Sequence, residues 1–282
     1  MKYFIINDFL SKDECLDLIK DSDKFIYTEA IPNMNSRRSL RSSNIEMINL
    51  ANKSRSWKNL LNKINSKDFF DYCFEKLNIN KKLFFQINYV NKIDKLSKFE
   101  LKFKKLGNQN LSVMNSFSIF KYLLFRIYLI IKKKIFFLKF IFKQSLPIEF
   151  IYDYSQAGNG YSREIHRDSD SRIVVILLYL NELSESARGG ELNLYKFIKN
   201  KKNKIPSRPN PEDCEIIERI KPYPGKLIIF QNTSESFHSV EEMLNHKGIR
   251  HFIYGGFTIL AGKNPFLLNS IDKLKTSEDS FI

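Results

Sequence analysis

Short apolar runs separated by turn residues dominate the chain from residue 148 onward. The turns contain glycine and proline, as at residues 189–190 and 222–225, and such breaks between apolar runs predict β-strands. Many short strands at close spacing favour a closed or double-sheet β architecture over alternating βαβ units. The predicted strands cover residues 149–154, 173–180, 191–195, 227–230 and 251–260.

The first 90 residues carry helical periodicity instead. Ser11 and Glu14 are spaced for a capping box, which predicts a helix that begins there and reaches about residue 21. Apolar residues recur at helical spacing in two further segments, residues 51–64 and 69–77. The remaining predicted elements are strands at residues 3–6 and 83–90 and polar loops at residues 33–43 and 196–211.

The composition indicates a folded chain with a large core. Of the 282 residues, 43% are hydrophobic and 25 are Phe, which excludes a wholly disordered protein. The cysteines Cys15, Cys73 and Cys214 are odd in number and scattered, so we expect neither a disulfide scaffold nor a zinc ribbon. The apolar run at the N-terminus ends too early for a signal peptide. We therefore expect a cytoplasmic protein.

The positive charge is concentrated in one segment. The formal net charge is +15, and residues 91–147 hold 13 of the 46 Lys and Arg residues against two acids, Asp94 and Glu100. The rest of the chain is nearly balanced, so a nucleic-acid-binding fold that is basic over its whole surface is not indicated, and we expect no nucleic-acid partner.

Residues 117–143 have the pattern of an amphipathic helix. Lys121, Lys132, Lys139 and Lys143 fall on one side at helical spacing, and the opposite side is apolar. The lysines interrupt every window long enough to span a bilayer, so a transmembrane helix is not predicted. Two interpretations stay open: peripheral contact with an anionic membrane, or an insertion that packs its apolar side on its own domain.

Two histidines and an aspartate form a candidate metal site. His166 and Asp168 stand two residues apart after a predicted turn, and residues i and i+2 of an extended chain project to the same side. His238 follows the apolar strand at residues 227–230 and supplies a third ligand. Two His and one carboxylate on one face of an ion form the facial triad of non-haem Fe(II) oxygenases, which leaves three positions open. Arg250, which enters the last predicted strand, can hold a carboxylate through two charge-assisted hydrogen bonds.

These motifs follow the order found in a known family. The chain resembles the Fe(II)- and 2-oxoglutarate-dependent dioxygenases, specifically their prolyl 4-hydroxylase-like branch. The resemblance covers residues 2–19 and 148–260. The elements that carry it in the second region are Ile151-Tyr152-Asp153-Tyr154, His166-x-Asp168, Tyr179-Leu180-Asn181, Gly189-Gly190-Glu191-Leu192, Pro222-x-Pro224-Gly225, His238-x-Val240 and Gly248-x-Arg250.

The resemblance implies an activity and a set of site residues. His166, Asp168 and His238 would bind iron, Arg250 would pair with the distal carboxylate of 2-oxoglutarate, and Tyr154 would donate its hydroxyl to the same carboxylate. Fe(II) is the implied cofactor and 2-oxoglutarate and O₂ are the co-substrates, with ascorbate as a candidate reductant. The implied reaction hydroxylates an unactivated C–H bond and releases succinate and CO₂.

Two features differ from the prolyl 4-hydroxylase pattern. The basic residue is Arg250 rather than Lys and lies two residues further from His238, and the turn between Tyr154 and His166 is longer. These differences leave the oxygenase class unchanged and leave the substrate open, so that a peptidyl proline, another protein residue or a small molecule is compatible with the sequence. The further candidates for the carboxylate anchor are Arg163, Arg167 and Arg172.

The expected fold is mainly β with flanking helices (α+β): a double-stranded β-helix, or jelly roll, with N-terminal support helices and a basic helical insertion. The expected divisions are residues 1–90 as the helical and strand support region of the oxygenase domain, 91–147 as the basic amphipathic insertion, 148–262 as the jelly-roll core and 263–282 as the C-terminal tail. Two alternatives stay open: the same fold hydroxylating a small molecule, lipid or glycan, and a non-catalytic jelly-roll binding module tethered by the basic helix.

Overall fold

A computed structural model describes residues 1–23, 36–86, 146–199, 205–260 and 264–267. The basic segment at residues 117–143 lies outside the described residues, and so does most of the expected tail. The expected domain boundaries stay a prediction. Within the described residues, none of the helices has the length and apolar character needed to cross a bilayer.

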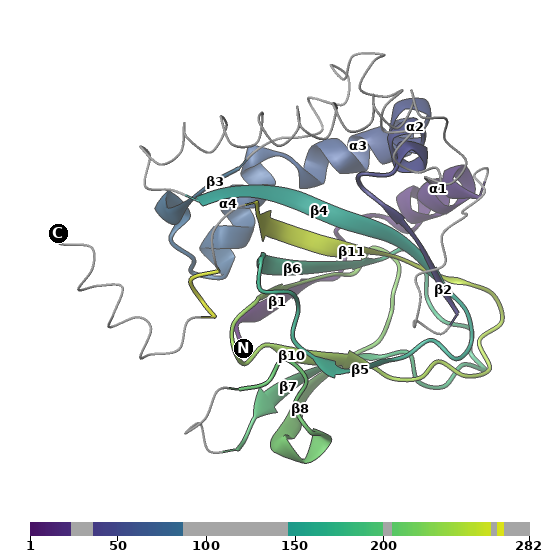
Figure 1. The fold of residues 1–282 in the computed structure, drawn as a ribbon. Helices are drawn as coiled ribbons and strands as arrows, with labels where there is room; N and C mark the ends of the chain where they lie inside the picture. Colours follow the sequence, from purple (N-terminus) through teal and green to yellow (C-terminus); the bar gives the residue numbers. More distant parts are fainter. Residues whose placement is uncertain (24–35, 87–145, 200–204, 261–263, 268–282) are drawn as a thin grey trace, which may run out of the picture.

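Two facing β-sheets form the centre of the molecule, with helices covering the outer side of the larger sheet (Figure 1). The larger sheet has seven strands in the order β1-β9-β6-β11-β4-β2, and β3 pairs with β4 in parallel. The smaller sheet has the order β5-β10-β7-β8. Every pairing between strands other than β3 and β4 is antiparallel. The expected class, mainly β with flanking helices, is confirmed as a double-stranded β-helix.

The strands of the larger sheet are β1 (Tyr3–Ile6), β2 (Arg37–Arg41), β3 (Phe84–Gln86), β4 (Leu146–Ala157), β6 (Arg172–Tyr179), β9 (Leu227–Gln231) and β11 (Arg250–Ile259). Those of the smaller sheet are β5 (Arg163–His166), β7 (Leu192–Phe197), β8 (Cys214–Ile220) and β10 (Phe237–Val240). The α-helices are α1 (Lys12–Ser22), α2 (Ile45–Lys53), α3 (Arg55–Ile64) and α4 (Lys67–Lys76). Short 3₁₀ helices cover Lys81–Leu83 and Pro211–Asp213.

The N-terminal helices begin where polar side chains cap them. The predicted capping box at α1 is present: the Ser11 hydroxyl accepts from the amide of Glu14, and the Glu14 carboxylate accepts from the amide of Ser11. The single helix predicted over residues 51–64 is wrong in one respect. Ser54 is extended, ends α2 and caps α3 by accepting from the amide of Trp57, so the chain forms two helices there.

Four strands differ from the sequence prediction. Residues 33–43 were expected as a loop, yet β2 lies within them and pairs with β4, which satisfies its backbone hydrogen bonds. Three strands of the smaller sheet, β5, β8 and β10, were not predicted. Both β5 and β10 have only four residues, and β8 alternates exposed and partly buried residues, so that one of its faces is exposed. Such short or half-exposed strands give little periodic signal and depend on their partners.

Alternate residues of the central strands face two different cores. In β6, the even-numbered residues from Val174 to Leu178 pack in the core shared with the helices. The odd-numbered residues from Val175 to Tyr179 pack between the two sheets. The same alternation holds for β11, where Ile253 and Phe257 face the helices and Phe252 faces the opposite sheet. The space between the sheets therefore receives every second side chain of the large sheet, and the candidate site lies there.

Candidate metal centre

The structure brings together the three residues that the sequence singled out. His166 ends β5 and His238 lies in the neighbouring strand β10, where the two are direct partners in the strand register. Asp168 lies two residues beyond His166, after β5 has ended. The ligand atoms of these three side chains all lie within 4.8 Å of one another. Within the described residues, this is the only group of three or more His, Cys, Asp or Glu that lies close enough to hold an ion.

The distances suit a single metal ion. Asp168 Oδ1 lies 4.0 Å from Nε2 of His166 and 3.9 Å from Nε2 of His238. Bonds from nitrogen or oxygen ligands to a divalent transition metal are about 2.1 Å long, so two of them span at most about 4.2 Å. One ion can therefore contact the carboxylate together with either imidazole. The other oxygen of Asp168, Oδ2, is buried and accepts no hydrogen bond from the described residues.

Backbone carbonyls orient both imidazoles. Nδ1 of His166 lies 2.8 Å from the carbonyl oxygen of Glu164, and Nδ1 of His238 lies 3.4 Å from that of Ser236. A carbonyl can only accept, so Nδ1 carries the proton and Nε2 of each ring is left unprotonated, as a metal ligand must be. Metal-ligating histidines are commonly oriented in this way.

The electrostatics keep the ligands in the state that binds a metal. Burial, then the neighbouring His238 and Arg163, lower the pKa of His166 to about 3. Burial also lowers the pKa of His238. Burial alone would raise the pKa of Asp168, but His238, Arg172 and the hydroxyl of Tyr254 outweigh it and lower the pKa. Two neutral imidazoles and one carboxylate are present at neutral pH, as metal coordination requires.

Two residues outside the predicted ligand set hold Asp168 in place. The hydroxyl of Tyr254 donates to Asp168 Oδ1, and Nη1 of Arg172 lies 3.5 Å from Oδ2. The Arg172 guanidinium also lies 4.9 Å from the centre of the Tyr254 ring. The sequence predicts Arg172 only as an alternative carboxylate anchor, whereas the structure places it beside Asp168. The alternation of β11 places Tyr254 on the same side as Arg250, which is the one signal in the sequence that could have identified it.

Arg250 lies deep between the sheets. Its side chain is 1% exposed, and its guanidinium lies 4.8 Å from the ring centre of Tyr179 and 5.2 Å from that of Phe252. Nη1 donates to the carbonyl oxygen of Gly190 at 2.7 Å, while Nε has no partner among the described residues. Gly190 has a φ of +80°, and a Cβ there would approach the side chain of Leu183 to 2.8 Å, so this position requires glycine.

The Tyr179 hydroxyl is a second unsatisfied donor beside Arg250. It is buried and makes no hydrogen bond with the described residues, and burial raises the pKa of Tyr179 to about 12. The phenol is therefore a hydrogen-bond donor at neutral pH. Buried polar groups are normally satisfied, and one that is not indicates a missing partner. Together, Nε of Arg250 and the hydroxyl of Tyr179 offer donors to an anion between the sheets.

Tyr154 is placed differently from the expectation. Its side chain projects from β4 toward the helices, where its hydroxyl lies 2.6 Å from the Ser22 hydroxyl and 2.6 Å from Nδ1 of His251. Its ring packs edge-on against Trp57 with centroids 5.0 Å apart. The expectation that Tyr154 donates to the 2-oxoglutarate carboxylate is therefore wrong, because Tyr154 and Arg250 lie on opposite faces of the large sheet.

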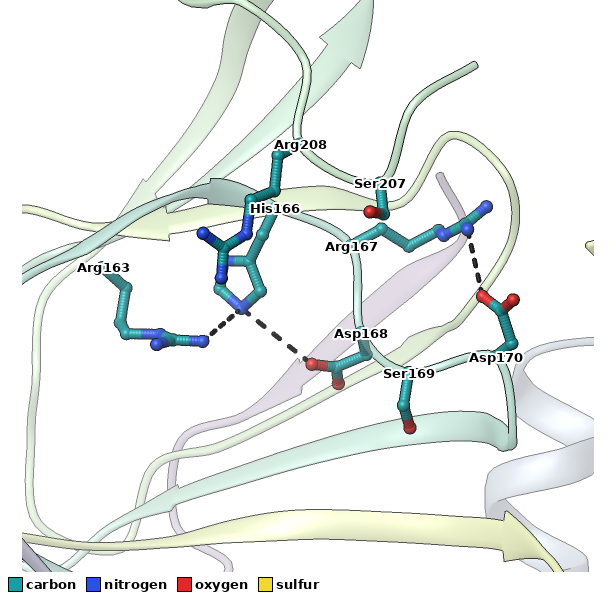
Figure 2. A pocket seen from close by; sticks show the side chains of 8 residues that line it. All are labelled: Arg163, His166, Arg167, Asp168, Ser169, Asp170, Ser207 and Arg208. Atoms are coloured by element: carbon teal, nitrogen blue, oxygen red, sulfur yellow. Dashed lines mark hydrogen bonds and ion pairs between the residues drawn. The ribbon is translucent and has the colours of Figure 1, made fainter. Parts of the chain in front are cut away.

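A cavity of about 510 Å³ opens beside the metal ligands (Figure 2). It is lined by Arg163, His166, Arg167, Asp168, Ser169, Asp170, Ser207 and Arg208. Two of the three candidate ligands therefore border a space large enough for a small molecule or a side chain. Figure 2 shows Arg167 turned away from the ligands toward Asp170, and Arg163 directed toward His166. Nη2 of Arg167 lies 3.0 Å from Asp170 Oδ1, and Nη2 of Arg163 lies 3.4 Å from Nε2 of His166.

Residues 151–257 match the 2OG-Fe(II) oxygenase superfamily. No curated protein sequence matches the chain. Among solved structures, the chain is similar to a prolyl-4-hydroxylase of Pseudomonas putida, with 14% identity and a TM-score of 0.46 over 92% of this chain and 94% of that one. It is also similar to a collagen prolyl hydroxylase of Paramecium Bursaria Chlorella virus-1, with 14% identity and a TM-score of 0.46 over 92% and 97% of the two chains.

The superfamily match confirms the resemblance found in the sequence motifs. The matched residues run from β4 into β11 and include the His166, Asp168 and His238 cluster as well as Arg250. Residues 151–257 thus match a 2OG-Fe(II) oxygenase domain, and this match supports an enzyme of the dioxygenase class. Fe(II), 2-oxoglutarate and O₂ are the cofactor and co-substrates that this superfamily implies.

Proposed function

We propose that this enzyme binds one Fe(II) through His166, Asp168 and His238 and uses 2-oxoglutarate and O₂ to hydroxylate an unactivated C–H bond, releasing succinate and CO₂. The observation that carries the proposal is the convergence of two imidazole Nε2 atoms and one carboxylate oxygen within 4.8 Å at a cavity. Three ligands from one side leave positions for a chelating co-substrate and for O₂.

Arg250 and Tyr179 are the proposed binding site for the distal carboxylate of 2-oxoglutarate. Both present donors that no described residue satisfies, and the Arg250 guanidinium is enclosed by aromatic rings. A carboxylate would compensate the buried positive charge and accept from both groups. Arg250 would thereby fix the orientation of the co-substrate, which is a positioning role.

The remaining residues keep the site in shape and limit its access to water. When bound, the iron supplies the oxidising chemistry of the reaction. Tyr254 and Arg172 hold the Asp168 carboxylate, and the carbonyls of Glu164 and Ser236 hold the two imidazoles. Val175, Leu177, Leu194 and other buried apolar side chains fill the space between the sheets. Such apolar walls exclude water and protect reactive species.

Metal titration of paired aspartate variants tests the metal site. Asp168→Ala removes a ligand and should lower the affinity for Fe(II), measured anaerobically, by at least a hundredfold, because two imidazoles alone hold the ion weakly. Asp170→Ala is the matched control, since Asp170 lies at the same cavity but its side chain is 79% exposed and contacts Arg167. Equal Fe(II) binding by the two variants would contradict the proposed ligand set.

Formation of succinate tests the reaction. Wild-type protein with Fe(II), ascorbate and 2-oxoglutarate should form succinate only when iron is present, with a higher rate when a substrate is included. A panel of proline-containing peptides, small metabolites, lipids and glycans separates a protein hydroxylase from an enzyme that acts on small molecules. Stoichiometric iron binding without any succinate would favour the non-catalytic binding module.

We also propose that the enzyme acts in the cytoplasm. Cys15 and Cys73 are buried and Cys214 is partly buried, and all three are free thiols. Free thiols are typical of a reducing compartment. A fluorescent fusion that localised outside the cytoplasm would contradict this proposal.

A further inference from the structure

The cavity beside the metal ligands is lined by more positive than negative side chains. Arg163, Arg167 and Arg208 contribute to its wall, and the acids there are Asp168 and Asp170. Both acids are already engaged. Asp168 belongs to the proposed metal site and accepts from Tyr254, and Asp170 pairs with Arg167 at 3.0 Å. The charges of Arg163 and Arg208 are left to face the cavity.

Arg163 is a cavity arginine that contacts a candidate metal ligand. Nη2 lies 3.4 Å from Nε2 of His166, the same atom that would coordinate iron. Within the described residues, no acid lies within ion-pair distance of Arg163. Coordination of iron by His166 Nε2 would occupy the lone pair that now faces the guanidinium. Arg163 would then stand beside the metal without a hydrogen-bond acceptor.

Arg208 lies on the cavity wall and has only a weak partner. Its side chain is 70% exposed, and its Nη1 lies 3.9 Å from the carboxylate of Glu164, which is itself 88% exposed. Exposed pairs at this distance contribute little, so the Arg208 charge is available to a ligand. The backbone amide of Arg167 donates to the carbonyl of Ser207 at 2.8 Å, which joins the Arg208 segment to the segment that carries Asp168.

From these observations we propose that Arg163 and Arg208 bind an anionic group of the substrate, a carboxylate or a phosphate, and thereby place its C–H bond at the metal. This inference rests on the proposed function and adds the charge class of the substrate. The anion site is separate from the proposed 2-oxoglutarate site, because Arg250 lies between the sheets and does not line this cavity. Arginine suits both anions because its planar guanidinium presents paired donors.

Anion binding by protein loaded with Mn(II) and 2-oxoglutarate tests the proposal without knowledge of the substrate. Equilibrium dialysis with inorganic phosphate and, separately, with acetate distinguishes a phosphate site from a carboxylate site. Wild-type protein should bind at least one of the two anions in the millimolar range. Arg163→Gln and Arg208→Gln should each weaken binding about tenfold, as expected for the loss of one charge-assisted hydrogen bond. Arg163→Lys should retain most of the affinity because the charge remains.

Arg219→Gln is the matched control. Arg219 is an exposed arginine of β8 that lies near Glu241 and does not line the cavity, so its loss should leave anion binding unchanged. Mn(II) and 2-oxoglutarate are quantified in the same samples. If both are retained and wild-type protein binds neither anion, or the Arg163 and Arg208 variants bind as tightly as wild type, the anion proposal is overturned while the proposed function stands. Failure to bind Mn(II) would overturn both.

Discussion

The two faces of the large sheet are built from the same strands and have opposite chemistry. On the face toward the helices, Phe70, Phe74 and Phe150 all pack edge-on against Phe257, with ring centroids 5.2 to 5.6 Å apart. On the face toward the small sheet, β6 and β11 present Arg172, Arg250 and Tyr254. The first face fills space with apolar rings, and the second carries the residues that we propose to hold an ion and its co-substrate.

The buried arginines explain why the second face is adapted to binding rather than to stability. Desolvation of a charge is costly, and Arg250 has only one carbonyl and three aromatic rings as partners among the described residues. Arg37, from β2, is similarly enclosed: it donates to the hydroxyl of Ser155 and lies 3.9 Å from Asp153. The comparison therefore predicts that mutations on the helix face change stability and that mutations on the other face change function.

The largest expected effect is a loss of stability on the helix face. Trp57 is completely buried, and its indole N–H donates to the carbonyl of Leu18 at 2.9 Å. Trp57→Ala should lower the free energy of unfolding by about 3–5 kcal/mol, because it leaves a cavity and removes a buried hydrogen bond. Urea denaturation measures this loss. Leu16→Ala, at a site that is 49% exposed, is the control and should change the value by less than about 0.5 kcal/mol.

Arg250→Met should separate function from stability on the other face. It removes the guanidinium and keeps an unbranched side chain, so the KM for 2-oxoglutarate should rise about a hundredfold, which corresponds to about 2.7 kcal/mol. The free energy of unfolding should stay level or increase, since a buried unpaired charge is lost. Arg250→Lys should have a smaller effect on KM because its charge persists. An unchanged KM in Arg250→Met would move the carboxylate anchor elsewhere.

The buried His251 on the helix face should make the free energy of unfolding depend on pH. Burial lowers the pKa of His251, so the folded state binds fewer protons than the unfolded state. The stability that this group contributes is present above its unfolded pKa of about 6.5 and is lost as the pH falls toward the folded value. His251→Asn should reduce the slope of unfolding free energy against pH by up to about 1.4 kcal/mol per pH unit below pH 6.5. Equal slopes in the metal-free wild type and variant would show that His251 does not titrate on unfolding.

Removal of one hydroxyl on each face offers the most closely matched test. Tyr154→Phe breaks hydrogen bonds to Ser22 and His251 and should cost about 1 kcal/mol of stability without changing the KM for 2-oxoglutarate. Tyr179→Phe removes a hydroxyl with no partner among the described residues, and should raise that KM about five- to tenfold while stability is unchanged. Denaturation and steady-state kinetics are measured on both variants. If Tyr154→Phe raises the KM and Tyr179→Phe lowers the stability, the assignment of the two faces is reversed.

The smallest effect on the enzyme is expected from the basic segment. We propose that residues 117–143, which lie outside the described residues, contact anionic membranes. Replacement of Lys121, Lys132, Lys139 and Lys143 by Gln should leave succinate formation unchanged and weaken co-sedimentation with anionic vesicles at low salt, by about 1 kcal/mol for each charge. Binding should also decrease as salt is added. If wild-type protein does not sediment with these vesicles, the segment has no membrane role.

The sequence by itself determined the elements whose signal is local. The spacing of His166 and Asp168 places both side chains on one side of an extended chain, and Ser11 and Glu14 interact within a single helical turn. Regular apolar runs located most strands of the large sheet. The family motifs singled out His238 and Arg250, and the structure brings them to the space between the two sheets.

Tertiary structure decided the features that depend on contacts between residues far apart in the chain, namely the roles of the tyrosines and the formation of the short strands. Tyr154 and Tyr179 are both tyrosines of apolar strands, and only the packing of helices on one side and the small sheet on the other determines which phenol stands beside Arg250. Tyr254 lies 86 residues from Asp168 in the chain. β2, β5 and β10 are strands because of the partners beside them. The alternation of side chains along a β-strand shows in the sequence which residues share a face. The layers packed on either side of the sheet determine which of the two faces encloses the site.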